Sequence, residues 1–180
     1  SSSPAISADG RWVAFESDAD TLVAGDTNFR RDVFVHDLQT LTTTRISLGP
    51  AGAQGNGASR FPAISADGRV VAFESDAGNL VPGDTNATWD VFVVDRLTGT
   101  TTRASVGPGG AQGSGASHDA AVSGDGRWVT FESSAANLVA GDTNNSTDVF
   151  TYDGLTRTTA RATSATTSAL RVRRCPPTVR

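Results

Sequence analysis

The chain has 180 residues, a formal net charge of −4 and an isoelectric point of about 5.0. This acidic balance disfavours a nucleic-acid partner, and no apolar run approaches the roughly 20 residues of a membrane-spanning helix. Cys175 is the only cysteine, which excludes an internal disulfide. The abundance of Gly, Ser, Thr, Ala and Asp favours an extracellular or periplasmic protein.

A repeat organises the chain. The string S-x-D-G-R-x-V-x-F-E-S occurs three times at a spacing of 58 residues, beginning at Ser7, Ser65 and Ser123. A second string, L-V-x-G-D-T-N-x-x-x-D-V-F, follows each copy. A unit repeated at a fixed period cannot bury its apolar faces alone and must stack on its copies.

The middle copy predicts four strands. Residues 61–65 form the first strand, 66–69 a tight Asp-Gly turn, 70–75 the second strand, 90–95 the third and 101–106 the fourth. The second and third strands are apolar on both faces, which indicates that both faces are covered. The fourth strand is more polar, as an outer edge strand should be.

These elements predict an all-β fold, a β-propeller of four-stranded antiparallel blades. A β-sandwich would show apolar–polar alternation, and no window has the 3.6-residue period of a helical repeat. We predict a three-blade unit over residues 1–163, with blades at about 1–50, 59–108 and 117–163 and glycine-rich linkers at 49–59 and 107–117. Residues 164–180 match nothing upstream and are predicted to form a disordered basic tail.

The string S-x-D-G-R-x-V-A-F-x-S, followed by D-V-F and a threonine-rich strand that ends in Arg, resembles the repeat of TolB-like β-propellers over about residues 4–162. The resemblance implies a rigid binding or scaffolding surface in a secreted bacterial protein. It implies no reaction, because one fold hosts many functions.

The number of blades bears on whether the propeller ring closes. Propellers close with about 4–8 blades, so three blades leave an apolar face bare at each end. We therefore expect a homo-oligomer in which two chains join head-to-tail into a six-bladed ring. The alternative is that the chain is an excerpt of a longer propeller.

The G-D-T-N-x-x-x-D insertion is the strongest candidate site. Its Gly, Asp, Thr, Asn and final Asp are identical in all three copies, whereas the three residues between them differ completely. Calcium prefers carboxylate and amide oxygens at alternate loop positions, which predicts calcium as a cofactor. The predicted ligands are Asp26, Asn28, Asp32, Asp84, Asn86, Asp90, Asp142, Asn144 and Asp148. The alternative is that these side chains form Asx turns.

The three glutamates of the chain share one repeat position after the strand phenylalanine. They are Glu16, Glu74 and Glu132. We consider them as additional cation ligands or as bonds that tie the insertion to its strand; the alternative is a solvated strand end. A catalytic role is disfavoured, because sites shared by every blade are usually architectural.

Trp89 lies in the variable triplet and is the one aromatic residue considered for ligand contact. Trp12 and Trp128 share the position of Val70, which predicts packing between blades. His36 and His118 do not recur in the repeat, and neither has a nucleophile and an acid that the sequence places beside it, which argues against a hydrolytic triad.

The other charged residues of the repeat are interpreted as structural. Asp9, Asp67 and Asp125 are predicted turn residues. The arginines that follow these turns and those on the fourth strand are predicted to pair with nearby acids, with little effect on stability where the pairs are exposed. They are Arg11, Arg69, Arg127, Arg45, Arg103 and Arg161.

Together these features predict a non-enzymatic propeller module that binds an unknown protein or glycan ligand, with calcium making its loops rigid. Two alternatives remain: a lectin with one sugar site per blade, and a propeller domain accessory to a hydrolase. The lectin requires repeated exposed aromatics, and the enzyme requires catalytic residues that do not follow the repeat.

Overall fold

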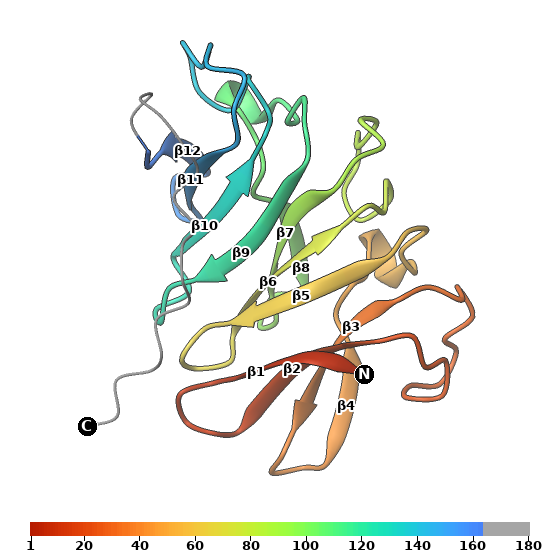
Figure 1. The fold of residues 1–180 in the computed structure, drawn as a ribbon. Helices are drawn as coiled ribbons and strands as arrows, with labels where there is room; N and C mark the ends of the chain where they lie inside the picture. Colours follow the sequence, from red (N-terminus) through yellow and green to blue (C-terminus); the bar gives the residue numbers. More distant parts are fainter. Residues whose placement is uncertain (164–180) are drawn as a thin grey trace.

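The computed structural model describes residues 1–163, which form three four-stranded antiparallel sheets (Figure 1). The first blade contains β1 (Ser2–Ile6), β2 (Trp12–Ser17), β3 (Asp32–Asp37) and β4 (Thr42–Arg45). The middle blade contains β5 (Ser59–Ile64), β6 (Val70–Ser75), β7 (Asp90–Asp95) and β8 (Thr100–Arg103). The third contains β9 (Ser117–Val122), β10 (Trp128–Ser133), β11 (Asp148–Asp153) and β12 (Thr158–Arg161). Each sheet is a meander of neighbouring strands, which confirms the predicted blade.

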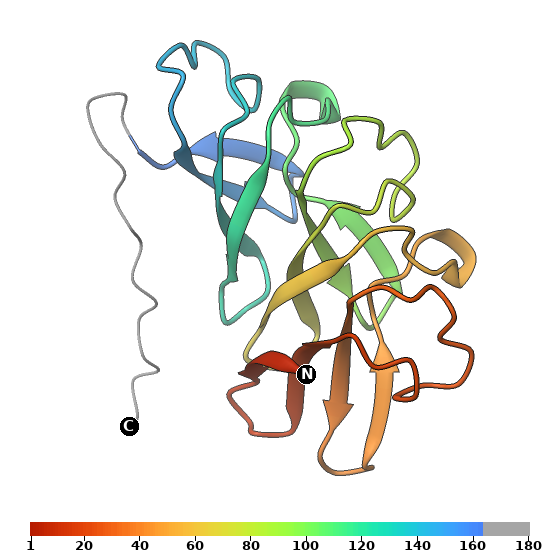
Figure 2. The same ribbon diagram turned by 45° about the vertical axis from the view of Figure 1, so that its right-hand side comes forward.

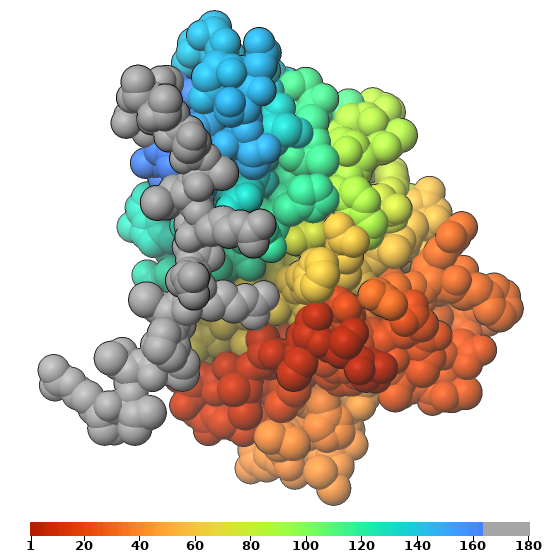
Figure 3. Space-filling model, viewed as in Figure 1, coloured from red at the N-terminus to blue at the C-terminus, as the bar shows by residue number. Residues whose placement is uncertain are grey.

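The blades stack as successive layers, with the middle blade between the other two (Figures 1 and 3). The first strands β1, β5 and β9 lie next to one another. The three G-D-T-N insertions lie along one edge of the stack, and the Asp-Gly turns lie at the opposite ends of the strands (Figure 2). The predicted tail and Cys175 lie outside the described residues.

The core lies between the blades rather than inside any one of them. Val33 and Val35 of the first blade face Phe73 and Phe92 of the middle blade in one buried cluster. A second cluster joins the opposite face of the middle blade to β10 and β11 of the third. The middle strands are therefore apolar on both faces because a neighbouring blade covers each face.

The first strand of each blade contains a bulge that the sequence did not indicate. The register shifts within β1, β5 and β9, and one residue in each bulge has a positive φ, namely Ser3 (51°), Phe61 (51°) and Asp119 (53°). A bulge residue is left out of the ladder. Its N–H group is therefore free to bond outside its own sheet.

The predicted turns are confirmed. Asp9, Asp67 and Asp125 each accept a hydrogen bond from the backbone N–H of the arginine two residues later. The linkers are more regular than expected, since each contains a short 3-10 turn, at Pro50–Gly52 and Pro108–Gly110. Neither of these two turns, the only helices described in residues 1–163, has the length and apolarity that a bilayer crossing requires.

Candidate functional site

An arginine at the end of each fourth strand places its largely buried guanidinium against the aspartates of the G-D-T-N insertion. In the first blade, Arg45 Nη1 lies 2.7 Å from Asp26 Oδ1 and 3.1 Å from Asp32 Oδ2. The side chain of Arg45 is 8% exposed, and those of the two aspartates are 3% and 0% exposed. The other blades repeat the arrangement, with Arg103 on Asp84 and Asp90 and Arg161 on Asp142 and Asp148.

The asparagine of each insertion points its amide nitrogen at the same carboxylate. Asn28 Nδ2 donates to Asp32 Oδ2 (2.9 Å) and to the carbonyl of Gly55 (3.1 Å), and Asn28 Oδ1 accepts from the backbone N–H of Arg30. Asn86 and Asn144 are oriented in the same way. This is the Asx-turn alternative. In this orientation the asparagine points its amide N–H group at the carboxylate, whereas an asparagine that binds a metal would point its amide oxygen into the site.

The predicted side chains therefore converge, but the cation among them is a guanidinium. Within residues 1–163 no group of three or more His, Cys, Asp or Glu side chains is placed to hold a metal ion. The fourth-strand arginines pair with nearby acids as predicted, and these pairs are largely buried rather than exposed. Calcium binding at these loops stays a prediction, and the arginine geometry argues against it, because the site already contains a permanent positive charge.

Some of the charged and polar groups at the arginine site are not fully compensated by their partners. Burial raises the pKa of Asp84, and the charge of Arg103 only partly offsets this effect. The Nε atoms of Arg45 and Arg103 are buried and have no hydrogen-bond partner within the described part of the chain. An unmade bond of this kind costs about 1–3 kcal/mol. The insertion thus depends on its arginine at some cost to the fold.

The linker glutamine completes the loop. Gln54 Oε1 accepts from the backbone N–H of Thr27 (3.1 Å), and Gln54 Nε2 donates to the carbonyl of Gly25 (2.8 Å). Asn79 of the middle blade donates to the carbonyl of Gln54 (2.8 Å). The linker therefore ties the insertion of one blade to the next blade, a role that its repetition in the sequence could have suggested.

The glutamates join blades. Glu16 and Glu74 are 2% and 1% exposed, so they are not solvated strand ends. Glu16 Oε2 accepts a 2.6 Å bond from the bulge N–H of Phe61, and Glu74 Oε1 accepts a 2.7 Å bond from that of Asp119. Each carboxylate thus satisfies the one N–H group that the bulge removes from the neighbouring sheet. Glu16 also contacts its own insertion, as one interpretation of the sequence proposed, because Arg31 Nη1 lies 3.4 Å from Glu16 Oε1.

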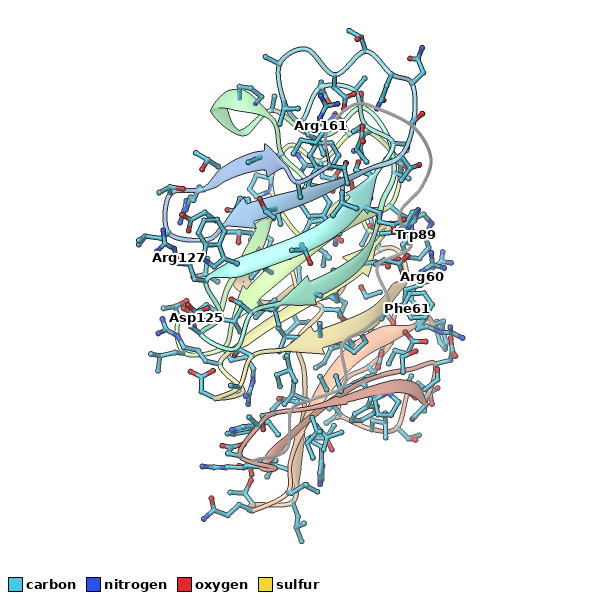
Figure 4. The ribbon with its side chains drawn as sticks, turned by 60° about the vertical axis from the view of Figure 1, so that its left-hand side comes forward. Arg60, Phe61, Trp89, Asp125, Arg127 and Arg161 are labelled. Carbon is cyan, nitrogen blue, oxygen red and sulfur yellow. The ribbon has the colours of Figure 1, made fainter. Side chains whose placement is uncertain are left out.

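Non-repeated side chains gather at one end of the strands. The Arg60 guanidinium lies 3.7 Å from the ring centre of Trp89 and 5.1 Å from that of Phe61. The rings of Trp89 and His118 are 6.3 Å apart, and His118 Nδ1 lies 3.1 Å from Glu74 Oε2. Trp89, the aromatic residue considered for ligand contact, is half-buried. Figure 4 shows Arg60, Phe61 and Trp89 together, with Asp125 and Arg127 at the opposite end.

At that opposite end, each turn arginine pairs with the last residue of the third strand. Arg11 contacts Asp37, Arg69 contacts Asp95 and Arg127 contacts Asp153, each through Nε and Nη2, which confirms the predicted pairing. These bonds hold the pKa of all three carboxylates below the usual range.

The structure resembles solved β-propellers. TolB from Acinetobacter baumannii is 24% identical with a TM-score of 0.54, over 91% of this chain and 32% of its own. A putative TolB from Agrobacterium tumefaciens is 18% identical with a TM-score of 0.56, over 88% and 44%. The β-propeller domain of the Trilobed protease from Pyrococcus furiosus is 15% identical with a TM-score of 0.53, over 88% and 40%.

The fold is that of a TolB-like β-propeller. The chain spans less than half the length of each of these three structures. No protein-family model matches the sequence, and neither does any curated protein sequence.

In this TolB-like propeller unit a cavity of about 690 Å³ lies between the first and middle blades. Its lining is mostly apolar and includes Ile46, Leu48 and Val94, and its charged residues are Arg45 and Arg96. The guanidinium of Arg45 is bound by the insertion, and no acid–base pair faces the cavity among residues 1–163. The cavity offers space for an apolar group.

A second cavity, of about 430 Å³, lies at the end of the strands that contains the non-repeated side chains. It spans the middle and third blades, and its lining includes Arg60, Phe61, Glu74, His118 and Glu132. The nearest approach to a catalytic pair here is His118 with Glu74. Glu74 also bonds Arg60 and the backbone of Asp119, so its carboxylate joins the middle and third blades.

Proposed function

We propose that the chain is a non-enzymatic binding and scaffolding unit of a TolB-like propeller. One observation carries the proposal: the charged side chains that recur in the blades are used to build the fold. Aspartates bind arginines within the insertions and turns, and glutamates bind the backbone of the next blade. Catalysis requires a nucleophile or base free to react, and the recurring groups are held in these bonds, except Glu132 of the third blade.

The proposed contact surface is the cluster of Arg60, Phe61, Trp89 and His118. Tryptophan and arginine are the residue types most often dominant in protein interfaces. Phe61 is 37% exposed and borders the smaller cavity. Because these residues do not recur, the surface distinguishes this end of the unit from a generic blade. We propose a protein segment as the ligand.

The lectin alternative is less well supported. A sugar would stack on a free aromatic face, but the guanidinium of Arg60 lies against the ring of Trp89. The position of Trp89 is occupied by Arg31 in the first blade and by Thr147 in the third, so the sugar site would not recur.

The second candidate is a propeller domain that assists a hydrolase domain. The similarity to the propeller domain of a protease favours it, and the present chain would then position substrate without reacting with it. Both candidates predict that the chain alone turns over no peptide or glycoside, so measurable turnover would contradict them.

We also propose that the unit works as a closed ring of two copies in an extracellular or periplasmic setting. The uncovered faces at the two ends of the stack and the polar composition support these proposals. Calcium is a competing proposal for the insertions, which the buried arginines already supply with a cation.

The contact surface is tested by selecting peptides from a displayed random library on the full chain. Binding of the selected peptides should be lost in Trp89→Ala and Arg60→Ala. It should be unchanged in Leu97→Ala, which alters an exposed leucine (76%) in the turn after β7. Equal binding by all three variants would contradict the assignment.

A further inference from the structure

Neighbouring blades in the stack are joined by contacts that need one residue from each blade. At the two outer faces of the stack, each of these contacts has only one of its two residues. Figure 1 shows the first and third blades at opposite ends of the stack, so the two outer faces do not meet within residues 1–163. Three kinds of contact recur at both internal interfaces, and each has one partner on the outer face of the first blade and the other on the outer face of the third.

The first contact is the glutamate bond. Glu16 accepts the bulge N–H of Phe61, and Glu74 accepts that of Asp119, 45 residues along the chain in both cases. Glu132 holds the same position in the third blade, lines the smaller cavity and takes no hydrogen bond from residues 1–163. Ser3 is the equivalent bulge residue of the first blade, with the same positive φ of 51°.

The second contact is a side chain seated on a turn glycine. A Cβ atom on Gly68 would lie 2.1 Å from Cδ1 of Trp12, and one on Gly126 would lie 2.7 Å from Cγ2 of Val70. The equivalent pair is Trp128 and Gly10. Trp128 is 41% exposed, and a Cβ atom on Gly10 would have nothing within 4 Å. The prediction that Trp128 packs between blades is therefore not met within the described chain.

The third contact is a backbone hydrogen bond between turns. The N–H of Ala8 donates to the carbonyl of Ala66, and the N–H of Ala66 donates to the carbonyl of Gly124, both at 2.9 Å. The next step of the series would join the N–H of Gly124 to a carbonyl equivalent to that of Ala8. Each blade would then donate to the one after it.

The first blade also has exposed apolar side chains at its outer face. Ile6 is 59% exposed and Leu38 is 48% exposed, whereas Ile64, the equivalent of Ile6, is half-buried. The exposed face of the third blade is more polar, with Thr130 and Thr151 where the middle blade has Ala72 and Val93. Such a face tolerates water when uncovered, which suits a reversible interface.

We propose that the third blade of one chain docks on the first blade of a second copy, so that the partner completes both incomplete faces. Glu132 of one copy accepts the N–H of Ser3 of the other, Trp128 sits on Gly10 beside Leu38, and Gly124 donates to the carbonyl of Ala8. This assignment rests on the proposed ring of two copies and names its interface. Two such interfaces, related by symmetry, close the ring.

Sedimentation of the full chain across the micromolar range tests the interface. The wild type should show twice the 18.5 kDa of one chain. Gly10→Asn places a side chain in the space that Trp128 would occupy, and asparagine tolerates a positive φ. Trp128→Ser removes the side chain that would occupy this space. Each should raise the dissociation constant about tenfold or more, as expected of a central tryptophan.

Gly83→Asn is the matched control, because Gly83 also has a positive φ (76°) and nothing near its Cβ position but lies in an insertion. It should leave the dimer intact. Circular dichroism checks that all variants fold. A wild-type chain that stays at 18.5 kDa overturns both the ring and this interface. A wild-type dimer that both substitutions leave unchanged overturns this interface alone.

Discussion

Glu74 Oε1 accepts a 2.7 Å hydrogen bond from the backbone N–H of Asp119, which lies in the next blade. The bulge in β9 exposes this N–H group, and the 1% exposed carboxylate fills the gap. The same relationship joins Glu16 to Phe61. A glutamate on the second strand of each of the first two blades therefore bonds the first strand of the next blade.

Removal of this carboxylate should destabilise the stack. Glu74→Ala leaves the N–H of Asp119 without an acceptor, and a hydrogen bond to a charged group contributes about 1.5–3 kcal/mol. We expect a loss of this size in the free energy of unfolding measured with urea. Glu132→Ala, at the same repeat position, should cost far less at protein concentrations where the chain is a monomer. Equal losses would show that the contact to the next blade is not what matters.

The turn glycines provide a second comparison. Gly68→Ala would place a Cβ atom 2.1 Å from Trp12, whereas Gly10→Ala has open space, and both positions have a φ of 72°. The shared backbone strain should cost about 1–2 kcal/mol in either variant. Gly68→Ala should lose clearly more, by the additional clash. Thermal melts of the two variants, compared at a low protein concentration, measure the difference, and identical melting temperatures would contradict the packing of Trp12.

The arginines inside the insertions should be essential to stability. Arg103→Ala leaves the buried carboxylates of Asp84 and Asp90 without a counter-charge, and breaking a buried pair in this way costs about 3–5 kcal/mol. Arg69→Ala is the control, because the Arg69 side chain is 49% exposed and surface pairs contribute little. A chain that tolerates Arg103→Ala as well as Arg69→Ala would refute the structural role of the buried arginine.

The pairs at the turn end predict sensitivity to acid. Hydrogen bonds from Arg11 and Arg127 hold the pKa of Asp37 and Asp153 well below the usual range. Because the folded-state pKa is lowered, this stabilisation is present above the unfolded pKa of about 3.9. It is lost as the pH falls below that value toward the folded-state pKa.

The melting temperature should therefore decrease as the solution is acidified through this range. Arg11→Gln should melt lower than the wild type at neutral pH, because Asp37 lacks its charged partner in this variant. The two melting temperatures should converge in acid, because protonation of Asp37 removes the ion pair from the wild type as well. A constant difference between the two proteins across the range would argue against the linkage.

The repeat allowed the blade to be predicted closely. The predicted second and third strands of the middle blade, residues 70–75 and 90–95, coincide with β6 and β7. This succeeded because strands covered on both faces are continuously apolar and because Asp-Gly turns mark their ends. The bulges were missed, since a positive φ at Phe61 or Asp119 has no signature in those residue types.

The site was harder to predict because its contacts join residues that are far apart in the sequence. Arg45 reaches back 19 residues to Asp26, while its own strand, Thr-Thr-Thr-Arg, has the polar pattern of an exposed edge. The sequence did contain a signal of this arrangement. Two aspartates and one arginine recur at a fixed spacing in each of the three blades, which indicates that their charges balance within the blade. Trp12 and Trp128 are alike in sequence and differ in burial only because a blade covers the first.

We propose that the recurring charges build the fold and that an arginine, rather than a metal ion, is the cation of each insertion. Calorimetric titration of the full chain with calcium tests this most directly, together with melts at matched calcium concentrations. We predict no binding heat and no rise in melting temperature. Stoichiometric calcium binding that raises the melting temperature, and that Asp26→Ala and its equivalents Asp84→Ala and Asp142→Ala weaken, would contradict the account.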